Sequence, residues 1–206
     1  MASSQSILSL FNSRKNIIEL LGELNFNIED YESFSINEID AMNKNAQMDM
    51  LIYHKTETKK VYIKYVPFVR QNNLEVIVDD LFCSETVLDR ENDILILISD
   101  DEPNEMILSK IQYLYDHDNI FVIIHNIKRL QFNIRKHVLT PSVRILSDEQ
   151  ELQLMQQYKL RDKTQLPEIS RFDPLALAIC MKPQQICEIK RSSTTALETL
   201  YYRVCV

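Results

Sequence analysis

Glycine is almost absent from this chain, which has 206 residues and one glycine, Gly22. The GxGxxG turn of dinucleotide-binding folds and the GxxxxGK phosphate loop both need several glycines, because the backbone must approach the phosphates closely. Nucleotide binding by these two routes is therefore excluded. Long apolar runs are missing too, since the longest spans residues 175–181, and the start, Met1-Ala2-Ser3-Ser4-Gln5, has no basic stretch before an apolar one. We expect neither a membrane span nor a signal peptide.

The four cysteines lack the spacing of a metal or redox site. Cys83, Cys180, Cys187 and Cys205 form no CxxC pair, and the four histidines lie apart from them in the sequence. Small buried thiols in a reducing compartment account for these residues better than zinc ligands or disulfides do. We expect an intracellular protein without a metal or cofactor.

Basic residues are scarce in the first two thirds of the chain. Residues 1–137 hold 14 Lys and Arg against 22 Asp and Glu, a net charge of −8, whereas residues 138–206 hold 9 against 8, a net of +1. Ten carboxylates and a single base, Arg90, lie between Asp79 and Glu105. Such a surface repels a phosphate backbone, so tight autonomous binding to nucleic acid is disfavoured.

Helix and strand patterns alternate over residues 1–137 and predict one α/β domain. Helices are expected over residues 6–24, 35–45, 71–82 and 103–115, the second beginning with a capping box at Ser35 and Glu38 and the fourth led by Pro103. In the first helix, Arg14 and Lys15 lie away from the apolar face. Strands are expected over residues 48–54, 60–66, 94–98 and 120–124, the first two forming a hairpin.

Shorter elements over residues 138–206 predict a small α+β domain with a mixed sheet. A capping box at Ser147 and Gln150 begins a helix that carries Leu152, Met155 and Tyr158. Leu166-Pro167 interrupts the chain, and Asp173-Pro174 begins a brief helix with Asp as the N-cap and Pro in the first turn. Residues 187–190 and 200–204 are candidate strands, joined by the polar loop 192–195.

A succession of short motifs in the last 50 residues has a recognisable order. The motifs are Tyr158-Lys159-Leu160-Arg161, Gln165-Leu166-Pro167-x-Ile169, Asp173-Pro174-x-Ala176, Arg191-x-Ser193-x-Thr195-Ala196 and Tyr202-Arg203. From about His137 to the C-terminus, this succession closely resembles the fifth subunit shared by eukaryotic nuclear RNA polymerases. The archaeal counterpart of that subunit is similar to the same part.

Residues 1–137 resemble the jaw domain of the eukaryotic subunit more weakly, in the order of elements and in the opening helix around Arg14-Lys15. The archaeal counterpart lacks this domain, so the resemblance implies the eukaryotic type. Glycines that the family usually has are missing at Cys180, Gln184 and Leu197. The divergence resembles that of a copy encoded by a large DNA virus of the asfarvirus type, which implies host cytoplasm and virion. An AT-rich cellular genome, with a nuclear protein, is the alternative.

The resemblance implies a non-catalytic structural subunit of a DNA-directed RNA polymerase, with no cofactor. Its jaw domain would form part of the lower jaw near downstream DNA, and its C-terminal assembly domain would dock on the largest subunit and the small omega-like sixth subunit. Expected interface residues are Tyr158, Lys159, Arg161, Arg191, Ser193, Thr195, Tyr202 and Arg203. Expected structural residues are Leu166, Pro167, Asp173, Pro174 and Ala196.

Contact between the jaw and DNA is expected to be weak. The family's proline-bearing loop falls at residues 101–104, where Asp100, Asp101, Glu102 and Glu105 repel phosphate. The only candidates for DNA-backbone contacts are Lys128, Arg129, Arg135 and Lys136, for which a solvated loop is an equal alternative.

Two other classes of function compete with the polymerase subunit. The jaw fold is similar to that of restriction-type nucleases, whose metal site needs one acid on a strand and an acid-x-Lys on the next. Asp49 and Lys64 are present, but Tyr62 replaces the second carboxylate, so we expect an inactive nuclease-like fold and no cleavage. A nuclease-fold DNA-binding protein and a free-standing transcription regulator remain alternatives. The lone histidines are expected to be structural or exposed.

Overall fold

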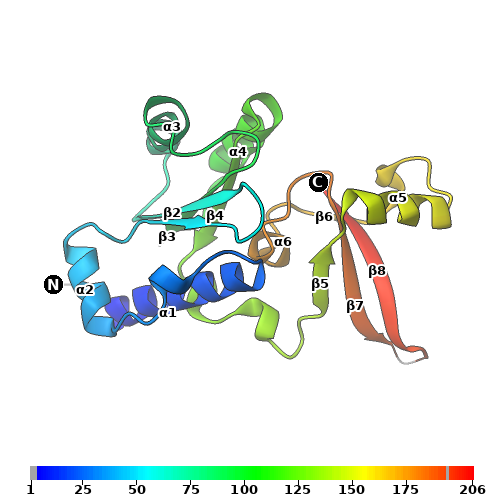
Figure 1. The fold of residues 1–206 in the computed structure, drawn as a ribbon, viewed down its shortest axis with the longest axis horizontal. Coiled ribbons are helices and arrows are strands. Elements are labelled where there is room, and N and C mark those ends of the chain that lie inside the picture. The colour runs from blue at the N-terminus through cyan, green and yellow to red at the C-terminus, as the bar shows by residue number, and fades with distance from the viewer. Residues whose placement is uncertain (1–3, 194) are drawn as a thin grey trace. The chain divides into compact units, whose positions relative to one another are not determined.

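The computed structural model describes residues 4–193 and 195–206 and divides the chain into two compact units, Met1–Asn133 and Ile134–Val206 (Figure 1). The boundary expected from the sequence, at His137, falls shortly after this division. Among the described residues, no helix is long and apolar enough to cross a membrane.

The first unit is built on a four-stranded sheet in the order β1-β2-β3-β4. β1 (Met50–Tyr53) runs antiparallel to β2 (Lys60–Val66), which confirms the predicted hairpin. β3 (Ile94–Ser99) and β4 (Phe121–Asn126) continue the sheet in parallel. Every residue of β3 and β4 is buried, as the apolar runs that begin both strands require.

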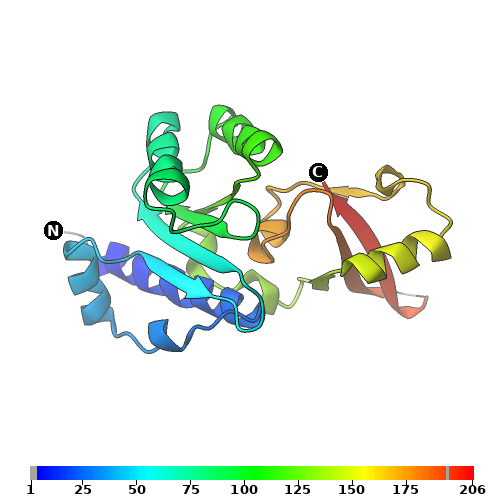
Figure 2. The ribbon, with the colours of Figure 1, turned by 45° about the horizontal axis from the view of Figure 1, so that its top comes forward.

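Helices cover both faces of this sheet. α1 (Ser4–Glu23) lies on one side, and α3 (Gln71–Asp79) and α4 (Glu105–Asp118) lie on the other (Figure 2). α2 (Ile36–Lys44) begins with the predicted capping box, and α3 continues into a π-helical turn, η2 (Asp80–Ser84).

The prediction that Pro103 leads α4 was wrong, because the Asn104 side chain accepts the Ile107 N–H at 3.0 Å and makes Asn104 the N-cap. The 3₁₀ turns of this unit are η1 (Glu29–Tyr31) and η3 (Arg129–Gln131).

Arg14 is buried, although the sequence places it away from the apolar face of its helix. Its side chain is 1% exposed, and its Nη1 donates to the Met48 carbonyl at 3.0 Å. The guanidinium carbon lies 5.3 Å from the ring centroid of Phe34 and 6.0 Å from that of Tyr31. Burial lowers the pKa of Arg14. The negative ring faces stabilise the charge inside the unit, and the helical period alone could not reveal this contact.

His125 is a buried neutral base on β4. Its ring is 4% exposed, and within the described residues its Nε2 has no hydrogen-bond partner. Burial, helped by the charge of Arg129, lowers the pKa of His125 to about 4. The unfolded chain therefore binds a proton at this ring at a higher pH than the folded chain does.

This difference predicts that the first unit loses stability in mild acid. Between pH 6.5 and about 4 the unfolded imidazole is protonated and the folded one is not, so the free energy of unfolding falls as pH falls, by about 3 kcal/mol across the window. Urea unfolding at several pH values measures the slope. The His125→Phe variant serves as the comparison, because it should lose that part of the slope; identical slopes would contradict the prediction.

The second unit contains a mixed four-stranded sheet in the order β5-β7-β8-β6. β5 (Ser142–Ile145) and β8 (Leu197–Cys205) both run antiparallel to β7 (Ile186–Ser193), whereas β6 (Glu168–Ile169) runs parallel to β8. The two predicted strands are present and longer than expected. β5 and β6 were not predicted, because these short strands are defined by pairing with β7 and β8, which lie far away in the chain.

Helices α5 (Asp148–Gln157) and α6 (Pro174–Ala178) and two 3₁₀ turns, η4 (Ile134–Lys136) and η5 (Lys163–Gln165), complete the second unit. The capping box at Ser147 and Gln150 is confirmed. Of the residues that this helix was expected to carry, Leu152 is 61% exposed and Tyr158 is the C-cap, and the buried apolar residue of α5 is Leu154. Glu151 is buried beside it because its carboxylate finds partners at the start of β7.

Left-handed backbone occurs at the three positions where the resemblance places glycine. The φ angles are 52° at Cys180, 67° at Gln184 and 58° at Leu197. The turn shape is therefore kept without the residue that adopts it most easily, at a cost of about 1 kcal/mol for each position. The only glycine serves packing instead, since a Cβ at Gly22 would lie 2.7 Å from Cδ1 of Ile28.

Gln184→Gly is expected to stabilise the second unit by roughly 0.5–1 kcal/mol. Glycine removes the backbone strain of the folded state, and the higher entropy of the unfolded chain offsets part of this gain. Gln184 is exposed, and its hydrogen bonds with Cys205 and Lys163 use only its own backbone atoms, which the substitution keeps. Urea unfolding measures the change. Gln184→Ala is the matched control, because it removes the same side chain while keeping the strain; an equal gain in both variants would show that the backbone is not its cause.

Candidate functional site

The β7–β8 ribbon, residues 186–193 and 197–205, extends beyond the rest of its sheet (Figure 2). β5 pairs only with residues 187–190 of β7, and β6 only with Val204 and Cys205 of β8. The outer part of the ribbon, 191–193 with 197–199, is therefore paired only with itself among the described residues. A two-stranded ribbon is marginally stable alone in water, so this projection is suited to contact with another molecule.

Strand alternation gives the ribbon two different faces. The stacked face carries Arg191, Tyr201 and Arg203, and the guanidinium carbon of each arginine lies 5.3 Å from the centroid of the Tyr201 ring. Nη1 of Arg203 also donates to the Glu168 carbonyl at 3.1 Å. Stacking on an aromatic ring orients a guanidinium without consuming its hydrogen-bond donors.

The paired face carries ion pairs and a second tyrosine. Nε of Arg144 donates to Glu188 at 2.7 Å, and the Tyr202 hydroxyl donates to the other oxygen of Glu188 at 3.1 Å. Lys190 pairs with Glu198 at 2.7 Å. The hydrogen bond from Arg144 lowers the pKa of Glu188, whereas burial, followed by the bond to Glu188, raises the pKa of Tyr202.

The tip of the ribbon is a hydrogen-bonded turn. The Ser193 hydroxyl lies 3.3 Å from that of Thr195 and accepts the N–H groups of Thr195 and Ala196, both at 3.4 Å. Thr194, part of the predicted loop, lies outside the described residues. Leu197 follows the turn and is 86% exposed. Ser193 therefore shapes the turn, and the exposed apolar surface at the tip belongs to Leu197.

The expected interface residues do not form one patch. Arg191 and Arg203 lie on the stacked face, and Ser193 and Thr195 lie at the tip. The remaining residues of the set lie elsewhere in the second unit: Tyr202 on the paired face, Tyr158 with its ring 6.0 Å from that of Tyr202, and Lys159 and Arg161 in the loop after α5.

Sequence reasoning missed several residues of these faces. They are Arg144, Glu188, Tyr201, Leu197 and Leu200. The signal that could have found Tyr201 is the period of two, which places it between Arg191 and Arg203 once the strands are extended and paired.

The expected structural residues have identified contacts. Asp173 accepts the Leu175 N–H at 2.8 Å, with Pro174 in the first turn, which confirms the predicted N-cap. The Pro167 carbonyl accepts the Val204 N–H at 3.0 Å, and Leu166 packs against the buried cluster of Leu146, Leu154 and Ile186. Ala196 lies in the turn at the tip, where its carbonyl accepts the Glu198 N–H at 2.6 Å.

The nuclease-like positions lie together in the first unit. Oδ2 of Asp49 is 3.1 Å from the Tyr62 hydroxyl and 3.3 Å from Nζ of Lys64. Burial, followed by the charge of Asp49, raises the pKa of Tyr62 to about 12, so this hydroxyl stays a hydrogen-bond donor. In the part of the chain that the structure describes, no group of three His, Cys, Asp or Glu residues is arranged to hold a metal. The Asp49 carboxylate is thus engaged by a phenol and an ammonium group.

The four candidates for DNA-backbone contact belong to two units. Lys128 and Arg129 lie in the first, and Arg135 and Lys136 in the second. Arg129 pairs with Glu102 at 3.0 Å, so part of its charge is balanced by the acidic loop that precedes α4.

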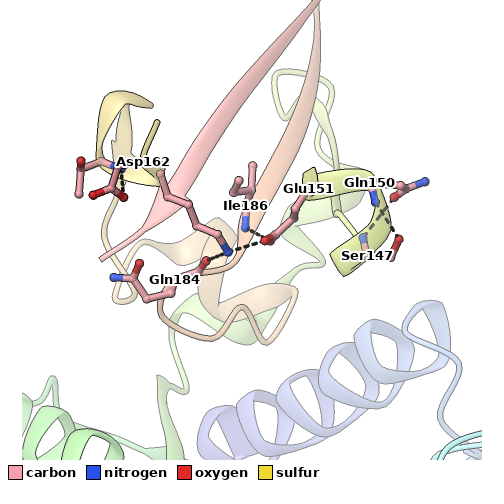
Figure 3. A network of polar contacts seen from close by, with 8 residues as sticks. Ser147, Gln150, Glu151, Asp162, Gln184 and Ile186 are labelled. Atoms are coloured by element: carbon pink, nitrogen blue, oxygen red, sulfur yellow. Dashed lines mark hydrogen bonds and ion pairs between the residues drawn. The ribbon is translucent and has the colours of Figure 1, made fainter. Parts of the chain in front are cut away.

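A polar network joins α5, η5 and the start of the ribbon (Figure 3). Oε1 of Glu151 accepts the Ile186 N–H at 2.9 Å, while Oε2 accepts from Nζ of Lys163. The same Lys163 Nζ donates to the Gln184 carbonyl at 2.9 Å. Asp162, which caps η5 through the Thr164 N–H, places the lysine. One buried carboxylate therefore fixes the base of β7 to two other elements.

Glu151→Ala is expected to lower the free energy of unfolding of the second unit by about 3 kcal/mol, because it leaves the Ile186 N–H without its acceptor and the Lys163 ammonium without its counter-charge. Urea unfolding and amide exchange in β7 measure the effect. Glu149→Ala, an exposed neighbour in the same helix, should change the free energy by no more than about 0.5 kcal/mol. Similar losses in the two variants would contradict the role of the network.

Comparison with known proteins relates this unit to one family. The family model described as RNA polymerase Rpb5, C-terminal domain, matches residues 132–205. The chain is 50% identical over 76 residues to the DNA-directed RNA polymerase subunit Rpo5 of Pyrococcus horikoshii, covering 92% of that protein and 37% of this chain. The matched segment contains the ribbon, its supporting network and every expected interface residue.

Two eukaryotic relatives also cover the first unit. The subunit rpabc1 of DNA-directed RNA polymerases I, II and III of Dictyostelium discoideum is 24% identical over 204 residues, 98% of this chain and all of that protein. Subunit 5A of RNA polymerase V of Arabidopsis thaliana is 24% identical over 195 residues, 91% of this chain and 83% of that protein. The high identity to Rpo5 across almost its whole length, together with these matches, shows that the chain belongs to the Rpb5 family of RNA polymerase subunits.

Proposed function

We propose that this Rpb5-family chain is a non-catalytic structural subunit that fastens its first unit to a multisubunit DNA-directed RNA polymerase. The observation that carries the proposal is the match of the Rpb5 C-terminal domain model to residues 132–205, the part that contains the projecting ribbon, together with the 50% identity to Rpo5 over 76 residues. Assembly of this kind needs shape and satisfied hydrogen bonds, with no nucleophile or metal. The proposed partners are the largest subunit and the omega-like sixth subunit.

The first unit is proposed to form part of the lower jaw near downstream DNA. The eukaryotic relatives that extend over this unit support a eukaryotic-type arrangement. The acidic loop before α4 and the pairing of Arg129 with Glu102 oppose a strong phosphate contact there. We propose that the jaw borders the DNA and contributes little binding energy of its own.

We also propose that the chain works inside the cell, in host cytoplasm and virion if it is encoded by a large DNA virus, or in the nucleus if it is cellular. The divergence of the chain, with non-glycine residues at three left-handed positions where the family usually has glycine, motivates the viral proposal, whereas the glycine-poor composition alone fits an AT-rich cellular genome equally well.

Charge reversal at Arg191 or Arg203 should weaken assembly without unfolding the chain. Arg191→Glu and Arg203→Glu are each expected to reduce the fraction of chain retained on affinity-purified polymerase by about tenfold. Each substitution places a negative charge against a partner surface that pairs with a positive one. The free energy of unfolding should change by less than about 0.5 kcal/mol in Arg191→Glu, since Arg191 is exposed on the outer ribbon. Arg203→Glu also removes the hydrogen bond to the Glu168 carbonyl and should cost about 1 kcal/mol.

Lys55→Glu, in the exposed turn between β1 and β2, is the matched control and should leave retention unchanged. Full incorporation of both arginine variants would refute the interface assignment. Failure of the native chain to join any polymerase would favour a free-standing regulator.

A further inference from the structure

The charges of the β7–β8 ribbon are sorted between its two faces. Both of its carboxylates, Glu188 and Glu198, lie on the paired face, where Arg144 and Lys190 neutralise them. The stacked face carries Arg191 and Arg203, and no ion pair joins either arginine to a carboxylate within the described residues. Two positive charges are therefore left uncompensated on one side of the ribbon.

The side chains of both arginines are oriented by contacts within the chain. Each guanidinium rests over the Tyr201 ring, and Arg203 is further oriented by its bond to the Glu168 carbonyl. Arg191 is exposed, so most of its donors face solvent. A planar guanidinium in a fixed orientation binds a carboxylate through two parallel hydrogen bonds and loses little side-chain entropy in doing so.

We propose that the stacked face binds an acidic segment of another polymerase subunit, with at least one Asp or Glu carboxylate seated on Arg191 or Arg203. This inference rests on the proposed function and adds the chemistry of the partner. A protein segment fits better than nucleic acid, because the same face ends in Leu197, an exposed apolar side chain. Phosphate backbones are bound by larger sets of cations, and residues 138–206 have a net charge of only +1.

Carbodiimide coupling in the assembled polymerase tests the proposal, because the reagent joins an amine to a carboxylate that it touches. The Arg191→Lys and Arg203→Lys variants each place an amine on the stacked face. Each full-length variant is co-purified with the polymerase, treated with the reagent and analysed by mass spectrometry. The Lys190–Glu198 pair, 2.7 Å apart on the other face, is a built-in control that should couple within the chain.

The expected result is an amide bond between the substituted position and an Asp or Glu of another subunit. Incorporation with coupling only at Lys190–Glu198 would overturn the acidic partner and leave the proposed function intact. Release of the native chain from the polymerase by nuclease digestion would identify a nucleic acid as the ligand and would also overturn it. Failure of the native chain to co-purify would refute the proposed function itself.

A charge series at position 191 separates electrostatics from packing. Retention on the polymerase should decrease in the order native, Arg191→Lys, Arg191→Gln, Arg191→Glu, with about a tenfold loss for the last. Equal losses in all three variants would mean that packing of the arginine stem, and not its charge, holds the partner, and the proposal would fail. Lys190→Gln, which removes a charge from the neighbouring position on the paired face, should keep native retention.

Discussion

The carboxylate of Glu151 is the contact on which the second unit depends most. It accepts hydrogen bonds from the N–H of Ile186, the first residue of β7, and from the Lys163 ammonium, which also donates to the Gln184 carbonyl. Helix, 3₁₀ turn and strand are thus tied at one buried point. Because β7 and β8 are paired along their length, fixing the base of β7 also fixes the direction in which the outer ribbon points. The stacked arginines are therefore presented by rigid elements.

The first unit depends on apolar burial, since its parallel strands must be covered on both faces. Close packing there leaves little room for polar groups, yet Arg14 and His125 are both buried. Each is accommodated differently: aromatic rings and one carbonyl surround the arginine, whereas the histidine remains uncharged. Both arrangements keep a polar side chain inside the unit without an ion pair to a carboxylate among the described residues.

Much of the fold could be predicted, because periodicity and caps act locally. The capping boxes at Ser35 and Ser147 and the Asp173 cap were all found from adjacent residues. β5 and β6 were missed because their pairing depends on residues far away in the chain. The interface residues could be named but not grouped, since the alternation that separates Arg203 from Tyr202 needs the register of β7 and β8. Tyr201 was missed for the same reason.

Left-handed backbone at Cys180, Gln184 and Leu197 has a consequence for how such proteins diverge. At Gln184 the turn is held by the residue's own backbone: its N–H donates to the Cys205 carbonyl, and its carbonyl accepts from Nζ of Lys163. Any residue except proline can make both bonds. The bend is therefore held by the hydrogen bonds around it, and the residue at the bend can change at a modest energetic penalty. A substitution there replaces the side chain and leaves the path of the main chain in place.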